Sequence, residues 1–165
     1  MTASRRRRHT VVDSPVGPLT LVDDDGALAG LWMADHRHRP PAPGDGERDD
    51  TVQAPLREQL AAYWQGQLTD FDVRLAAPGT DFQQRVWRAL QRIPYGRTWT
   101  YGRLAVEVGN PAASRAVGLA NGRNPVGIVV PCHRVVGSNG DLTGYGAGLA
   151  RKRFLLDLES GAALF

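Results

Sequence analysis

The chain has 165 residues, of which 42% are hydrophobic and 22% charged, as is typical of a globular protein with one sizeable core or two small domains. No run of about 18 apolar residues occurs, so no membrane contact is predicted, and the basic segment Met1–Arg8 lacks the apolar stretch of a secretion signal. A single cysteine excludes an internal disulfide and a zinc site built on thiolates, and a cytoplasmic location is the default expectation.

Basic side chains are concentrated in the second half of the chain. Residues 79–165 carry eleven Lys and Arg against five Asp and Glu, whereas residues 1–78 carry nine against twelve. Four of those nine form the run Arg5–Arg8, which we interpret as part of a flexible basic arm over residues 1–9. A basic second half favours a polyanionic partner, although an uneven scatter of surface charges explains the same counts equally well.

The first part of the chain predicts a small antiparallel sheet and one helix. Turn residues at Gly17-Pro18 and Asp24–Gly26 separate three strand-like runs. The predicted elements are strands at 10–12, 19–22 and 28–32, a polar surface loop at 35–50, a helix from Pro55 to near Gly66, and a strand at 71–75. The segment Ala77–Gly79 marks the boundary between two predicted domains, 1–77 and 78–165.

The second part predicts three helices. They are a helix with a capping box of Thr80 and Gln83 that runs to Ile93, a helix from Thr100 to Val108, and a helix that begins at Pro111 with Asn110 as its cap and ends at Asn121-Gly122. A short turn with Gly109 joins the last two helices, which suggests a helix-turn-helix, although many pairs of core helices have the same pattern.

The last of these helices has an unusual exposed face. It is predicted to bury Ala113, Ala116, Val117 and Ala120, and to expose Ala112, Ser114, Arg115, Gly118 and Leu119. A helix that reads the major groove usually carries several long polar side chains. Small residues instead allow close approach to a minor groove, where Arg115 could replace an extruded base.

The only cysteine, Cys132, follows the apolar run Gly127–Val130, which is predicted to be a buried strand. In a regular strand Cys132 and His133 would point to opposite faces, so a bridging water rather than a direct contact would join them. A free thiol has a pKa of about 8.5, so its reactivity requires a base such as His133, which itself needs a carboxylate partner. The alternative is that both are inert core residues, which is the more frequent case for an isolated Cys-His pair.

The sequence resembles the O6-alkylguanine-DNA alkyltransferase family. Pro131–Val135 matches the active-site motif of that family, and Asn124–Val126 precedes it at the family's spacing. Further matching segments are Gly79–Gln83, Val86-Trp87, Ile93–Gly96, Tyr101–Ala105, Ser114–Gly118 and Thr143–Tyr145. The resemblance implies an α/β N-terminal ribonuclease-H-like domain and a mainly α-helical C-terminal domain with a helix-turn-helix of winged-helix-like form.

The resemblance also implies an activity, which is direct DNA repair by a suicide reaction. An alkyl group would move irreversibly from O6-alkylguanine in duplex DNA, with O4-alkylthymine as a further candidate, to Cys132 after the nucleotide flips out. No cofactor and no metal are expected, and His36 and His38 are expected to be exposed in the long loop. The partner would be duplex DNA contacted through its minor groove by a protein that is monomeric in solution, with cooperative assembly on DNA left open.

Individual roles follow from the resemblance, position by position. Cys132 would accept the alkyl group, His133 would deprotonate it through water, and Glu159 would orient His133. Asn124 would brace the turn that holds the site, and Tyr101 would donate a hydrogen bond to the guanine. Arg115 would fill the space of the flipped nucleotide, and the other implied DNA contacts are Ala113, Ser114, Gly118, Arg123 and Tyr101. The implied alkylguanine pocket consists of Tyr101, Val135, Tyr145, Gly146 and Ala147.

Two other classes of protein remain as alternatives. A non-catalytic helix-turn-helix module could bind lesions without reacting, although the alkyltransferase-like proteins of that kind lack the cysteine that this chain has. A cysteine hydrolase could use Cys132 and His133 with turnover, and it would require an oxyanion hole, of which the sequence gives no independent sign.

Overall fold

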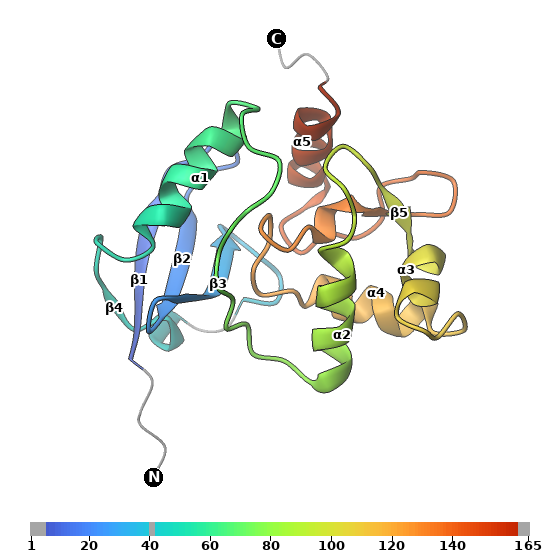
Figure 1. The fold of residues 1–165 in the computed structure, drawn as a ribbon, viewed down its shortest axis with the longest axis horizontal. Helices are drawn as coiled ribbons and strands as arrows, with labels where there is room; N and C mark the ends of the chain where they lie inside the picture. Colours follow the sequence, from blue (N-terminus) through green and yellow to red (C-terminus); the bar gives the residue numbers. More distant parts are fainter. Residues whose placement is uncertain (1–5, 40–41, 162–165) are drawn as a thin grey trace.

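The computed structural model describes residues 6–39 and 42–161 and consists of two parts that lie side by side (Figure 1). The first part is a four-stranded sheet in the order β3-β2-β1-β4, with the helix α1 (Ala54–Trp64) beside it. Its strands are β1 (Arg7–Val12), β2 (Leu19–Asp24), β3 (Ala27–Met33) and β4 (Glu47–Arg48), of which β4 alone runs parallel to β1. The three predicted strands of the meander are therefore confirmed, and each is longer than predicted.

The outer edge of β3 is covered by the second part of the protein. Leu31 donates a backbone hydrogen bond to the carbonyl of Pro125 at 2.8 Å and forms a bridge with Val126. Every residue of β3 is buried, as expected for a strand with protein on both sides. The sheet thus holds the segment that leads to Cys132 directly, through a backbone hydrogen bond from Leu31.

Three predictions for the first part are wrong. Residues 7–9 of the predicted flexible arm lie in β1, where Arg8 pairs with Asp49 at 2.8 Å, whereas Arg5 lies outside the described residues. The predicted loop at 35–50 contains a short 3-10 helix, η1 (Ala42–Asp45), and the strand β4. The predicted strand at 71–75 is absent from the described chain, because this segment meets β3 only at the bridge between Leu75 and Leu28.

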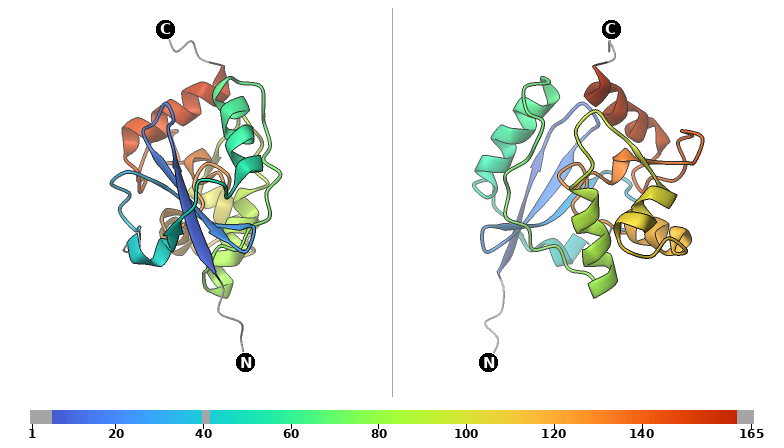
Figure 2. Two further views of the ribbon diagram at one scale, coloured as in Figure 1. Left: turned by 90° about the vertical axis from the view of Figure 1, so that its left-hand side faces the viewer. Right: turned by 45° about the vertical axis from the view of Figure 1, so that its right-hand side comes forward.

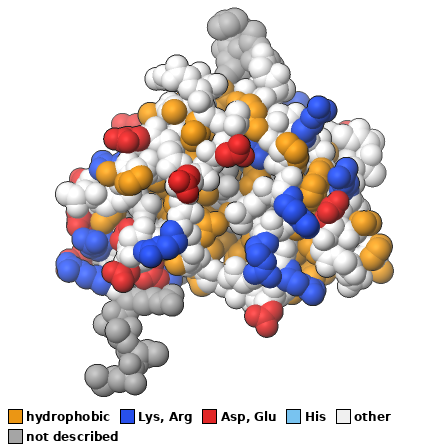
Figure 3. Space-filling model, in the orientation of Figure 1, with side chains coloured by type: hydrophobic (Ala, Val, Ile, Leu, Met, Phe, Trp, Pro, Cys, Tyr) orange, Lys and Arg blue, Asp and Glu red, His pale blue; other side chains and the backbone are white. Residues whose placement is uncertain are grey.

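The second part consists of helices and a small parallel sheet. Its helices are α2 (Asp81–Leu90), α3 (Tyr101–Glu107), α4 (Ser114–Gly122), the 3-10 helix η2 (Cys132–Arg134) and α5 (Leu149–Ser160), and its strands are β5 (Trp99–Thr100) and β6 (Val135–Val136). The predicted pair α3 and α4 pack against each other and against α2, and α5 lies at the same end of the molecule as α1 (Figure 2). Figure 3 shows Lys and Arg side chains gathered over α2, whereas the first part displays both signs of charge.

Three predictions for the second part are wrong. The helix α4 begins at Ser114, because Asn110 closes a turn in which its N–H donates to Ala105 and its carbonyl accepts from Ala113. Ala116 is exposed rather than buried, and α4 buries Val117, Ala120 and Asn121 instead. The apolar segment 127–130 is a turn rather than a strand.

No helix within residues 6–39 and 42–161 combines the length and the apolar character needed to cross a membrane.

The capping box at the start of α2 is confirmed and provides a stability test. The Thr80 hydroxyl accepts from the N–H of Gln83 at 3.1 Å, and the Gln83 side chain accepts from the N–H of Thr80 at 2.9 Å. Thr80→Ala should lower the free energy of unfolding by about 1 kcal/mol, measured by urea denaturation. Thr98→Ala, at an exposed position without a cap, should change it by less than about 0.5 kcal/mol, and equal losses would contradict the assignment.

Candidate active site

The turn before Cys132 is held by one buried side chain, that of Asn124. Its carbonyl oxygen accepts from the N–H of Val126 at 3.0 Å, and its amide donates to the carbonyl of Val130 at 2.8 Å. These two bonds replace the sheet pairing that the apolar sequence favours. Ile128 within the turn has a φ of 70°, which is strained for a β-branched residue, and its side chain is fully buried. The turn therefore depends on the surrounding protein to keep its shape.

Cys132 begins η2 and lies at a pocket of about 220 Å³. Its side chain is almost completely buried, and burial raises the pKa of the thiol, while the Asn124 amide, the Lys152 ammonium and the Tyr145 hydroxyl oppose that rise. The thiol is therefore mainly protonated in the free protein. Because the thiolate is the nucleophile, the reaction requires a base close to Cys132.

A buried base is present in His133, whose Nε2 lies 2.8 Å from Glu159 Oε2. Arg134 binds the same carboxylate through Nε at 2.7 Å and Nη2 at 3.1 Å. Burial tends to raise the pKa of Glu159, but the hydrogen bonds and charges of His133 and Arg134 outweigh it and lower the pKa to about 2. Burial lowers the pKa of His133 against the opposing effect of Glu159. His133 is thus a neutral imidazole whose Nε2–H donates to an ionised carboxylate.

The second ring nitrogen of His133, Nδ1, is buried and has no hydrogen-bond partner among the described residues. With Nε2 protonated, Nδ1 carries a lone pair and can accept a proton. A buried polar atom of this kind is usually satisfied by an ordered water. A water at Nδ1 would satisfy this atom, and the relay expected from the sequence requires a water at that nitrogen.

Lys152, on α5, binds the loop at 143–146, which forms one wall of the pocket. Its Nζ donates to the carbonyls of Thr143 and Gly144, both at 3.2 Å, and burial lowers its pKa to about 8 against the opposing effect of Cys132. Tyr101 also donates to the carbonyl of Thr143, at 2.8 Å. The loop at 143–146 is therefore bound from two helices, and the hydroxyl hydrogen of Tyr101 is engaged in the free protein.

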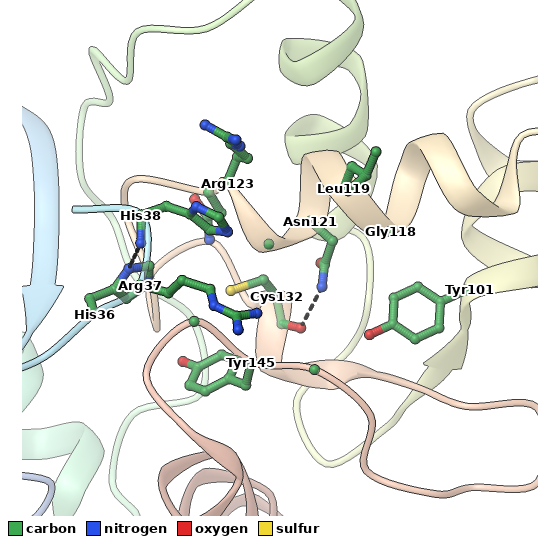
Figure 4. Close-up of a pocket in the computed structure, with 14 residues that line it drawn as sticks. His36, Arg37, His38, Tyr101, Gly118, Leu119, Asn121, Arg123, Cys132 and Tyr145 are labelled. Atoms are coloured by element: carbon green, nitrogen blue, oxygen red, sulfur yellow. Dashed lines mark hydrogen bonds between the residues drawn. The ribbon is translucent and has the colours of Figure 1, made fainter. Parts of the chain in front are cut away.

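The pocket brings together many of the residues identified from the sequence (Figure 4). Cys132 lies at its centre in the close-up, with Arg37 and Tyr145 to one side and Tyr101 to the other. The predicted site residues that line it are Tyr101, Gly118, Arg123, Asn124, Cys132, Tyr145 and Gly146. Of the remaining predicted residues, Val135, Ala147, His133 and Glu159 are buried outside the lining, and Ala113, Ser114 and Arg115 lie at the start of α4, where Ser114 and Arg115 are exposed.

Residues from the first part of the chain also line the pocket, and the sequence analysis missed them. They are His36, Arg37 and His38, and the expectation that both histidines are exposed is wrong, since both are partly buried. His36 packs edge-on against Trp32 with ring centroids 4.9 Å apart, and a Cβ at Gly146 would come within 2.6 Å of its ring. The run His-Arg-His-Arg at 36–39 was the available signal, because it places four polar, potentially cationic side chains in one loop.

Both parts of the chain match known protein families. Residues 8–77 match the model of the ribonuclease-like domain of 6-O-methylguanine DNA methyltransferase, and residues 81–161 match the model of its DNA binding domain. These matches confirm the fold class expected from the sequence.

Relatives with similar sequences span nearly the whole chain. The methylated-DNA–protein-cysteine methyltransferase of Mycolicibacterium paratuberculosis is 54% identical over 92% of this chain and 91% of its own. The protein of the same name from Methanosarcina acetivorans is 48% identical over 92% of this chain and 97% of its own. The structure of Mycobacterium tuberculosis OGT in complex with DNA superimposes with a TM-score of 0.90 at 51% identity, covering 94% of each chain.

The lowered pKa of Glu159 predicts how acid affects stability. A carboxyl whose pKa is lower in the folded than in the unfolded chain contributes stability above the unfolded value of 4.5, and this contribution is lost as the pH falls toward about 2. Glu159→Gln, a neutral isostere, should therefore be less stable than wild type by roughly 2–4 kcal/mol near neutral pH. The difference in the free energy of unfolding between the two proteins should shrink as the pH falls. It is measured by urea denaturation over the pH range in which both proteins stay folded.

The exposed Glu58 on α1 provides the control for this measurement. Glu58→Gln should be within about 0.5 kcal/mol of wild type at every pH. A stability difference for Glu159→Gln that stays constant down to acid pH would contradict the ionised state assigned to Glu159.

Proposed function

This chain belongs to the 6-O-methylguanine DNA methyltransferase family, and from that membership and its site we infer that it repairs alkylated DNA by transferring the alkyl group to Cys132. The observation that carries this assignment is the lone cysteine at a pocket beside a buried, oriented imidazole. A DNA substrate is compatible with the cytoplasmic location expected from the sequence. We retain residues 1–77 and 78–165 as the two domains.

The alkyl transfer begins with removal of the thiol proton. A water between Cys132 and His133 passes that proton to Nδ1, and Glu159 stabilises the imidazolium that forms, because its carboxylate already binds Nε2. The thiolate then attacks the alkyl carbon of O6-alkylguanine. An S–C bond forms while the C–O bond breaks, and its electron pair stays on O6. The leaving guanine anion takes up a proton from water, and the His133 imidazolium returns the thiol proton to water, so the protons balance.

The reaction consumes the protein. Its product at Cys132 is a thioether, and neither His133 nor water can readily cleave the C–S bond of a simple alkyl thioether. Each molecule therefore transfers one alkyl group. Tyr101 can donate its hydroxyl hydrogen to the guanine only after releasing the Thr143 carbonyl, so we expect the loop at 143–146 to adjust when the base enters.

The target base must leave the duplex to reach Cys132, since an atom on a base edge is not accessible to a buried thiol inside a stack. We propose that α4 binds the minor groove and that Arg115 occupies the space left by the base. The exposed side chain of Arg115 and the small residues Ala113, Ser114 and Gly118 on this helix support that proposal. We expect the free protein to be a monomer that binds duplex DNA containing O6-alkylguanine.

The acceptor can be tested by mass. Wild-type protein mixed with duplex DNA that carries O6-methylguanine should gain one methyl group, mapped to Cys132 by peptide mass spectrometry. Cys132→Ser should gain none while it still binds DNA. An unchanged wild-type mass would favour a binding module, and repeated turnover would favour a hydrolase; either result would refute the transfer.

Arg115→Ala tests the role proposed for the start of α4. Loss of the side chain that fills the gap should slow repair of duplex DNA roughly tenfold, because extrusion of a base costs a few kcal/mol. Reaction with free O6-benzylguanine should change less than about twofold, since no base must leave a stack. Arg153→Ala removes the same charge from an exposed position on α5 and should leave both rates nearly unchanged. Equal slowing of Arg115→Ala on both substrates would refute the role.

A further inference from the structure

The carboxylate of Glu159 receives a hydrogen bond from the first domain as well as from η2. The hydroxyl of Tyr63, on α1, donates to Oε2 at 2.5 Å. Tyr63 lies 96 residues before Glu159 in the chain, and both side chains are buried. This is a contact between domains at the one group that orients the catalytic base, and the alkyl-transfer chemistry described above gives it no role.

Tyr63 and His133 share one oxygen atom. Oε2 accepts from Tyr63 at 2.5 Å, from His133 Nε2 at 2.8 Å and from Arg134 Nη2 at 3.1 Å, whereas Oε1 accepts from Arg134 Nε at 2.7 Å. Each donor draws negative charge from the oxygen it binds. The Tyr63 hydroxyl therefore reduces the charge that Oε2 presents to His133.

The phenol ring of Tyr63 is completely buried and tightly packed among aromatic side chains. It contacts Trp64, Phe71 and Tyr95, with ring centroids 5.1, 5.3 and 6.3 Å away, and its side chain is completely buried. Burial, followed by the charge and hydrogen bond of Glu159, raises the pKa of Tyr63 far above its usual value, so the hydroxyl remains a donor at every working pH. The packed ring thus holds the hydroxyl in place, and the hydroxyl in turn fixes the position of the Glu159 carboxylate.

We propose that Tyr63 is a positioning residue of the alkyl-transfer reaction, which fixes Glu159 and limits the basicity of His133 from the neighbouring domain. The proposal rests on the function proposed above. Without this donor, Oε2 would carry more negative charge, would stabilise the imidazolium more strongly, and would raise the pKa of His133. A more basic His133 stays protonated to a higher pH and cannot accept the thiol proton there. Removal of the hydroxyl should therefore shift the acid limb of the rate profile upward.

Other charged and titratable groups also act on Glu159 and His133, and these groups must stay unchanged in the test. Arg134 lowers the pKa of His133, as Lys152 does. Tyr95 and Tyr145 are influenced by the charge of Glu159, and Tyr95 lies against the guanidinium of Arg134 at 5.7 Å. Among the described residues the hydroxyl of Tyr95 makes no hydrogen bond to Glu159, so Tyr95→Phe is the matched control for Tyr63→Phe.

The test compares side chains at position 63 that differ in how strongly they donate a hydrogen bond to Glu159. The second-order rate of methyl transfer is measured between about pH 4 and 9 for wild type, for Tyr63→Phe, and for protein with the more acidic 3-fluorotyrosine at this position. The midpoint of the acid limb should rise by roughly half a unit in Tyr63→Phe, which corresponds to about 0.7 kcal/mol at about 1.4 kcal/mol per pKa unit. It should fall with 3-fluorotyrosine and stay unchanged in Tyr95→Phe.

Midpoints that do not follow donor strength overturn the proposal, even if the plateau rate falls, because a merely structural loss lowers the rate equally at every pH. If Tyr63→Phe does not fold, the fluorinated protein still carries the test, since it keeps the hydrogen bond. Wild-type protein that gains no methyl group would overturn the proposed function itself. Wild-type protein that reacts normally beside variants with unmoved midpoints would overturn only the role of Tyr63.

Discussion

The buried carboxylate of Glu159 is the constraint on which the rest of the site depends. An ionised carboxylate is very costly to bury unless hydrogen bonds satisfy it, so α1, η2 and α5 must meet where their side chains can supply and receive those bonds. Once formed, the arrangement fixes the ring of His133 and leaves Nδ1 free to act as a base. The same group thus joins the two domains and, in the proposed mechanism, assists deprotonation of Cys132.

A second constraint brings Cys132 to that base. The edge of β3 binds Pro125 through Leu31, and Asn124 closes the turn that follows. The strained φ of Ile128 persists because its side chain is buried in the core that both domains share. The first domain therefore contacts the site in three ways: through the hydrogen bond of β3 to Pro125, through the hydrogen bond of Tyr63 to Glu159, and through residues 36–38 in the pocket lining.

Local sequence signals predicted those parts of the fold that local chemistry determines. The capping box at Thr80 located α2, and the motif around Cys132 suggested the acceptor and its base. Where tertiary hydrogen bonds compete with propensity, the prediction was wrong: the apolar run 127–130 predicted a strand, but the hydrogen bonds of Asn124 hold it as a turn. The contact between Tyr63 and Glu159 could not be predicted, because it joins two positions 96 residues apart and no local pattern in the predicted helix from Pro55 to near Gly66 indicates it.

The proposed mechanism requires that Glu159 hold His133 as a neutral base with its proton on Nε2. Nitrogen-15 NMR of the imidazole tests this most directly, with the His133 signals assigned by their loss in His133→Asn. At about pH 7 we expect a protonated Nε2 and an unprotonated Nδ1. A proton on Nδ1, whether in the other tautomer or in an imidazolium, would contradict it.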